Sequence, residues 1–142
     1  MIRIVFRVDA SPAIGAGHVA RCLALAKVMA SLRCECAFAV GPETLATVPA
    51  LERAGFETLI VETEEENAAR LLKEQFQEQP DWLVIDHYGI DAASEASYRT
   101  VAHNLMVIDD LADKPHDCDL LLDQGPGRVA SDYTGLVPLG AV

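Results

Sequence analysis

The chain has 142 residues, 51% hydrophobic and 23% charged, so it is long enough to build one globular core and too apolar to be disordered. Its 11 Lys and Arg against 22 Asp and Glu give a formal charge of -11 without any basic cluster, which argues against nucleic acid as a partner. Because no apolar run approaches the ~18 residues of a membrane span, and the N-terminal segment lacks a signal-peptide pattern, we expect a cytoplasmic protein without membrane insertion.

Short apolar runs rich in Val, Ile and Leu alternate with longer stretches of helical periodicity. This alternation is typical of a parallel sheet covered by helices on both faces. We expect strands at 2–8, 35–40, 58–61, 82–86, 105–108 and 120–122. Helices are expected at 19–32, 44–54, 64–77 and 92–102, with Gly55 and Pro80 ending the second and third. The pattern predicts a single α/β domain with a Rossmann-like, doubly wound parallel sheet in three layers.

The cysteines contain no C-x-x-C pair, so we interpret them as small buried hydrophobic residues rather than as redox or metal sites: Cys22, Cys34, Cys36 and Cys118.

Polar residues gather after the carboxyl ends of the predicted strands. They are Asp9 and Ser11 after the first strand, Asp86, His87 and Tyr88 after the fourth, Asp109 and Asp110 after the fifth, and Asp123 and Gln124 after the sixth. Ligands of open parallel sheets bind at this edge. Each carboxylate taken alone is equally well explained as a helix cap or turn residue. Their convergence is what predicts a site.

The segment 15–20 (GAGHVA) fits the dinucleotide-binding pattern G-x-G-x-x-A. However, it begins several residues beyond the first strand, and Gly41 and Pro42 follow the second strand where an acidic residue would hold a ribose. We therefore do not expect a nicotinamide cofactor, or any other cofactor. Instead the two glycines allow a ligand close to a helix start, where the helix dipole favours a neutral His18 able to accept a proton. The alternative is a capping or packing role for His18.

A second histidine, His87, competes for the same role. Together with Asp86, Asp109 and Asp110 it could bind a divalent cation, but no H-x-x-x-H spacing supports a metal site, and we favour hydrogen bonds to substrate. His103 and His116 lie among less polar residues and are interpreted as structural.

Several segments together resemble the UDP-sugar hydrolases of pseudaminic acid biosynthesis (the PseG family), with relatives among spore-coat polysaccharide proteins and MurG-like glycosyltransferases. The matching segments are 6–11 (FRVDAS), 14–21 (IGAGHVAR), 85–89 (IDHYG), 108–110 (IDD), 118–124 (CDLLLDQ), 132–133 (DY) and 136–139 (LVPL). They span nearly the whole chain in the family's order.

This resemblance implies a metal-independent hydrolase that cleaves UDP-2,4-diacetamido-2,4,6-trideoxy-β-L-altropyranose to UDP and the free sugar, with inversion at the anomeric carbon. The family's general base falls on His18. The candidate substrate-binding residues are Arg7, Asp9, Gly15, Gly17, Arg21, Asp86, His87, Tyr88, Asp109, Asp110 and Gln124.

Members of the family are typically two-domain proteins of the GT-B type, about twice this length, whose second domain makes most uridine and diphosphate contacts. The resemblance thus implies that this chain is the N-terminal GT-B half and that a C-terminal nucleotide-binding domain lies outside it. A second departure is Gly125 after Gln124, where the family pattern has Asn. Two alternatives stay open: a MurG-like glycosyltransferase, whose acceptor His18 would deprotonate instead of water, and a non-catalytic sugar-binding half.

Overall fold

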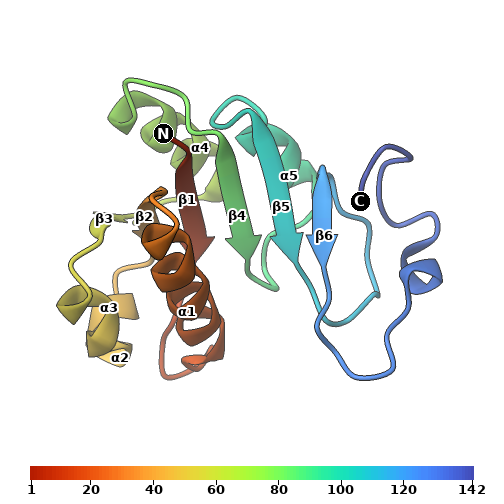
Figure 1. Cartoon of the computed structure of the whole chain (residues 1–142), viewed down its shortest axis with the longest axis horizontal. Coiled ribbons are helices and arrows are strands. Elements are labelled where there is room, and N and C mark those ends of the chain that lie inside the picture. Colours follow the sequence, from red (N-terminus) through yellow and green to blue (C-terminus); the bar gives the residue numbers. More distant parts are fainter.

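The computed structural model describes residues 1–142 and contains one six-stranded, fully parallel sheet with helices on both faces (Figure 1). The strands are β1 (Arg3–Val8), β2 (Glu35–Val40), β3 (Glu57–Ile60), β4 (Trp82–Asp86), β5 (Asn104–Ile108) and β6 (Leu120–Leu122). Their order, β3-β2-β1-β4-β5-β6, is that of a Rossmann sheet. The predicted Rossmann-like, doubly wound fold is therefore confirmed.

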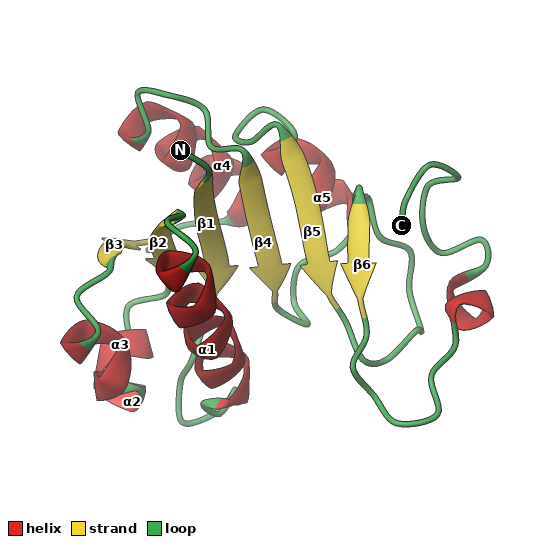
Figure 2. Ribbon diagram, viewed as in Figure 1, coloured by secondary structure: helices red, strands yellow, loops and turns green.

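Two apolar cores lie on opposite faces of this sheet, because side chains alternate along each strand. The helices are α1 (Gly17–Ser31), α2 (Thr44–Thr47), α3 (Pro49–Arg53), α4 (Glu65–Gln75), α5 (Ala92–Tyr98) and a 3-10 turn at Ala130–Tyr133. On one face α4 and α5 pack behind the sheet (Figure 2), and Leu72 and Tyr98 belong to the same buried cluster as Val5. On the other face α1 and α3 pack Val19 and Leu51 against Phe6.

The helix predicted over 44–54 is broken into α2 and α3. Pro49 lacks a backbone N–H, and its ring disfavours helical torsions at the preceding residue, so Val48 takes φ -127 and ψ 76. Gly55, at φ +76, ends α3 as predicted.

Two other helices are shorter at their C-terminal ends than predicted. Helix α4 ends at Gln75, ahead of Pro80, because Phe76 turns to an extended backbone and buries its ring in the core. Helix α5 ends at Tyr98 rather than at residue 102. By contrast α1 begins two residues earlier than predicted, at Gly17, which places His18 in its first turn. None of the helices combines the length and the apolar character that a membrane span requires.

The two neighbouring leucines of α4 test how far this core stabilises the fold. Leu72 is fully buried, whereas Leu71 is 37% exposed. We expect Leu72→Ala to lower the free energy of unfolding by about 2–5 kcal/mol, because it leaves a cavity under the sheet. Leu71→Ala makes the same change in helix propensity and should cost less than about 1 kcal/mol. Urea denaturation measures both, and equal losses would contradict the packing described.

Candidate active site

A hollow of about 360 Å³ opens at the carboxyl ends of the strands, between the start of α1 and the loops after β4, β5 and β6. All four arrowheads of β1, β4, β5 and β6 point to this end of the molecule (Figure 1). The strand order reverses between β1 and β4, the usual ligand position in such sheets. The lining residues are Ile14, Gly17, His18, Arg21, Tyr88, Asp110 and Gln124, and all but Ile14 are predicted site residues.

Asp86 joins β4 to α1 at the back of this hollow. Its carboxylate is 1% exposed and accepts a hydrogen bond from His18 Nδ1 at 2.7 Å. It also accepts two hydrogen bonds from the Arg21 guanidinium, from Nε at 2.8 Å and from Nη2 at 2.6 Å. His18 and Arg21 meet the same carboxylate because they are three residues apart on one helical face.

The charge state of Asp86 fixes the tautomer of His18. Burial alone would raise the pKa of Asp86, but the hydrogen bonds from His18 and Arg21 and the charge of Arg21 hold that pKa below its usual value. A carboxylate 2.7 Å from Nδ1 requires a proton on that nitrogen. Arg21 Nη2 also lies 3.2 Å from Nδ1, but the shorter contact to the carboxylate assigns the proton to Nδ1. A neutral ring then has its lone pair on Nε2, for which the protein provides no hydrogen-bond partner.

Tyr88 stands beside this imidazole, 48% exposed, with its ring edge-on to His18 at 4.6 Å between centroids. Its hydroxyl donates to Asp110 Oδ1 at 2.6 Å, and that bond, with partial burial and the charge of Asp110, raises the pKa of Tyr88 to about 12. Lys114 Nζ donates to the Tyr88 carbonyl at 2.6 Å. These hydrogen bonds hold Tyr88 in place, and its apolar ring and polar hydroxyl both face the hollow.

His87, the competing histidine, has both ring nitrogens occupied. The Gly89 N–H donates to Nδ1 at 2.9 Å, so the proton sits on Nε2, which donates to Asp9 at 2.8 Å. A side chain at position 89 would approach the ring within 2.8 Å, so this turn needs glycine. Because no lone pair is free, His87 is poorly suited to act as a base.

Arg7 and Asp9, both predicted to contact substrate, lie in a buried charge network rather than on the hollow. Arg7 is 2% exposed and binds Asp9 at 2.5 Å and Glu65 at 2.7 Å. Asp9 also accepts the Gly41 N–H at 2.6 Å. With their polar atoms engaged inside the protein, these two residues hold the loops after β1, β2 and β4 together.

Asp109 also points inward, although its neighbour Asp110 lines the hollow. It is 3% exposed and accepts the Tyr133 hydroxyl at 2.9 Å and the Ala112 N–H at 3.0 Å. His116 packs against it from the other side, bound to Glu95 at 2.6 Å, as suits the structural role predicted for it. Burial opposes the charge of His116, but Glu95 and Asp109 raise its pKa.

The glycine loop shapes the other wall of the hollow. Gly15 takes φ +87, which favours glycine, and its N–H donates to the Ser11 carbonyl at 2.7 Å. No side chain caps α1, and no acidic residue lies in its first turn. Gly17 and His18, in the first turn of α1, line the hollow beside Arg21, and no side chain caps their N–H groups. No three His, Cys, Asp or Glu side chains converge as they would around a metal ion.

Glu65 and Tyr98 are the residues near the site that the sequence analysis missed. Tyr98 donates to Glu65, which in turn holds Arg7. Glu65 lies within a run of three glutamates and Tyr98 within an ordinary helical pattern, so neither carries a local signal.

Sequence comparison gives one informative relative and no matching family model. Over 137 residues, 96% of its length, the chain is 32% identical to a UDP-2,4-diacetamido-2,4,6-trideoxy-beta-L-altropyranose hydrolase of Campylobacter jejuni. The chain spans about half, 47%, of that protein. The resemblance predicted from the motifs is thus confirmed by overall similarity.

The charge network around Asp9 makes a prediction about acid stability. Burial would raise the pKa of Asp9, but hydrogen bonds from His87 and Arg7, with the Arg7 charge, hold it well below its ordinary value. Since the folded state favours the ionised form, the resulting stabilisation is complete above the unfolded pKa of about 4 and is lost as pH falls below it. Asp9→Asn should lower the free energy of unfolding by about 3 kcal/mol at pH 7. In acid, the free energies of unfolding of the variant and of the unsubstituted chain should become more similar.

Urea denaturation at neutral and acidic pH measures this difference. Asp113→Asn is the matched control, because Asp113 is exposed and makes no ion pair. A difference for Asp9→Asn that does not change with pH would show that Asp9 is not held ionised by the network.

Proposed function

We propose that this chain, a homologue of about half of a UDP-sugar hydrolase, carries the sugar-binding and catalytic half of an enzyme that hydrolyses a UDP-linked diacetamido-trideoxy sugar. The observation that carries the proposal is the His18 imidazole, bound through Nδ1 to Asp86 with Nε2 free at the hollow. A bound water would donate its hydrogen bond to Nε2. This matches the requirement for a general base.

In the proposed reaction His18 Nε2 takes a proton from water as its oxygen attacks the anomeric carbon on the face opposite the nucleotide. The bond from that carbon to the diphosphate oxygen breaks, its electron pair leaves with UDP, and the configuration inverts. Asp86 stabilises the imidazolium that forms, because its charge lies 2.7 Å from Nδ1. UDP is a stable anion, so departure of the leaving group needs little acid assistance.

The residues around His18 suit the remaining parts of such a substrate. Tyr88 offers a ring face and edge to a sugar, and Asp110 and Gln124 offer polar atoms to its amides and hydroxyls. Arg21 Nη1 has no partner nearer than Asp110 at 4.0 Å, so it is available to an anionic oxygen. The start of α1 adds free N–H groups.

His18→Ala tests the assignment of the base. We expect this chain alone to turn over poorly, so UDP release from the diacetamido substrate is followed under single-turnover conditions with excess protein. The rate should fall at least about 100-fold in the variant, because water then lacks a proton acceptor. The fold should survive, since Asp86 keeps its ion pair with Arg21. His103→Ala changes an exposed histidine and should leave the rate unaltered.

Two results would contradict this assignment. A folded His18→Ala chain that releases UDP at the original rate would place the base elsewhere. Release that strictly requires a sugar or lipid acceptor would replace hydrolysis with glycosyl transfer. Proton NMR of the first anomer formed checks the inversion separately.

We also predict that this chain binds free UDP weakly, with a dissociation constant of about 0.1 mM or higher. The net charge of -11 repels a diphosphate, and Arg21 is the one cation that lines the hollow. In the proposed arrangement the uridine and diphosphate are held mainly by residues beyond this chain. Calorimetric titration measures the affinity, and low-micromolar binding would show that this half grips the nucleotide by itself.

A further inference from the structure

The segment 132–133 (DY), one of those that resemble the PseG family, lies outside the hollow. Tyr133 ends the 3-10 turn at Ala130–Tyr133, which lies beside β6 at the edge of the sheet (Figure 1). The other residues of this turn are exposed, whereas Tyr133 is only 6% exposed. A phenol that is buried in an otherwise exposed turn normally has a defined partner for its hydroxyl.

The Tyr133 hydroxyl connects two carboxylates that follow neighbouring strands. Its oxygen lies 2.9 Å from Asp109 Oδ2, after β5, and 2.7 Å from Asp123 Oδ2, after β6. The phenol has one hydrogen, so it donates to one of these oxygens at a time. Burial, together with the hydrogen bonds to Asp123 and Asp109, raises the pKa of Tyr133 well above its ordinary value, so the hydrogen is retained. Tyr133 therefore joins the two loops without adding a charge.

Arg128 joins the same two loops a second time. Its Nε lies 2.7 Å from Asp123 Oδ2, and its Nη2 donates to the Asp110 carbonyl at 2.9 Å. The Gly125 N–H donates to the other oxygen of Asp123, Oδ1, at 2.7 Å. A Cβ at position 125 would lie 2.9 Å from that oxygen, so the turn is tight. Asp123 is thus the point at which Tyr133, Arg128 and its own loop meet.

The residues joined in this way precede the two polar residues that line the hollow on this side. Asp110 follows Asp109, and Gln124 follows Asp123. Gln124 is exposed, and its loop contains two glycines, of which Gly127 has φ +78. Because such a loop buries little apolar surface, its position depends on its polar contacts. The contacts of Tyr133 and Arg128 therefore fix where Gln124 stands.

We propose that Tyr133 is a positioning residue for sugar binding, whose hydroxyl sets the spacing between Asp110 and Gln124. The inference rests on the proposed function, in which these two residues contact the amides and hydroxyls of the sugar. The proposed base belongs to a different part of the hollow, because His18, on α1, is held by Asp86 of β4. Loss of the Tyr133 hydroxyl should therefore weaken sugar binding more than it slows the chemical step.

Tyr133→Phe tests this role, since it removes the hydroxyl, keeps the ring and changes no charge. Initial rates of UDP release at varied concentrations of the diacetamido substrate separate binding from chemistry. We expect KM to rise at least about fivefold and kcat to fall less than about twofold, because the residues that contact the sugar are displaced and the proposed base is not. Arg128→Gln, at a partly exposed position, loosens the same loops and should change KM in the same direction. Circular dichroism checks that each variant is folded.

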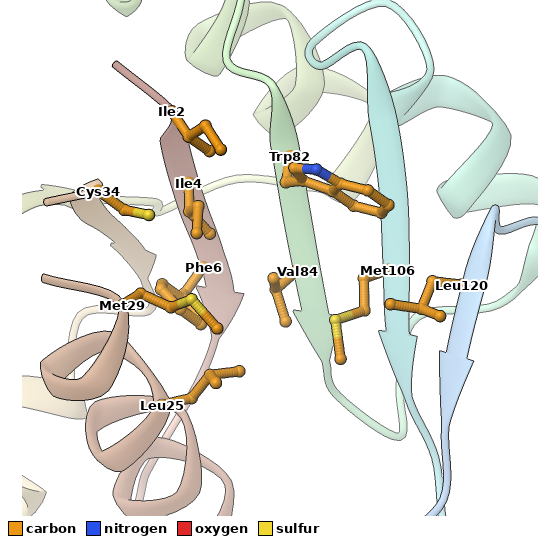
Figure 3. A pocket seen from close by; sticks show the side chains of 10 residues that line it. All are labelled: Ile2, Ile4, Phe6, Leu25, Met29, Cys34, Trp82, Val84, Met106 and Leu120. Carbon is orange, nitrogen blue, oxygen red and sulfur yellow. The ribbon is translucent and has the colours of Figure 1, made fainter. Parts of the chain in front are cut away.

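Leu120→Ala is the control for a loss of stability alone. Leu120 lies on β6, three residues before Asp123, and is half-buried. Figure 3 shows its side chain in an apolar groove on the sheet face, near Met106 of β5. This groove shares no residue with the hollow around His18. Leu120→Ala should lower the free energy of unfolding in urea, as Tyr133→Phe does, but should leave KM unchanged.

NMR provides a readout that does not depend on turnover. In proton–nitrogen correlation spectra of the whole chain, the backbone and side-chain amide signals of Gln124 should shift in Tyr133→Phe and stay in place in Leu120→Ala. If the unsubstituted chain releases no UDP while these signals shift as expected, the proposed hydrolysis is wrong and the positioning of Gln124 by Tyr133 stands.

Three results would overturn the positioning role. The first is a folded Tyr133→Phe chain in which the Gln124 signals do not move. The second is an active Tyr133→Phe chain whose KM is unchanged, whatever happens to its kcat. The third is an equal rise of KM in Leu120→Ala, which would show that KM follows the stability of β6 and not the Tyr133 hydroxyl.

Discussion

The candidate site depends on one buried carboxylate. Asp86 ends β4, is 1% exposed, and is held by His18 and Arg21, with a longer contact from the Cys22 thiol at 3.7 Å; all three residues lie on α1. A buried charge without partners would cost several kcal/mol, so the first turns of α1 are held against the end of β4. The same contact places the proton of His18 on Nδ1 and leaves Nε2 for chemistry. The contact with Asp86 therefore both stabilises the fold and prepares the proposed base.

Around this contact the site is organised as two layers of charge. The inner layer, in which the buried Arg7 holds the partly buried Asp9 and Glu65, ties together loops that are far apart in sequence. The outer layer, Arg21 with Asp110, is partly open to the hollow. A strongly acidic chain can thus present a cation and free helix N–H groups to a ligand, because nearby carboxylates are already paired with protein donors. The net charge of the chain therefore does not predict the charge of the surface around the hollow.

The sequence predicts the strands well because each parallel strand here is a largely continuous apolar run: β2, β4 and β6 have the predicted bounds. Helix ends are less predictable, since burial of Phe76 outweighs the continuation of α4. Within the site, the strand-end rule correctly gathers His18, Tyr88 and Gln124 on one hollow. It does not distinguish them from Asp9, which follows β1 in the same way but binds Arg7 in the inner network. That difference arises from Glu65 and Tyr98, whose approach is a property of the tertiary structure alone.

The two ends of α1 are under different structural constraints. Its first turns must stay open, since the uncapped N–H groups and His18 Nε2 serve a ligand only if no side chain occupies them. Its last turns carry Val28 and Leu32 into solvent, which is unfavourable for an isolated chain. Covering those last turns from outside removes apolar surface from water without touching the first turns.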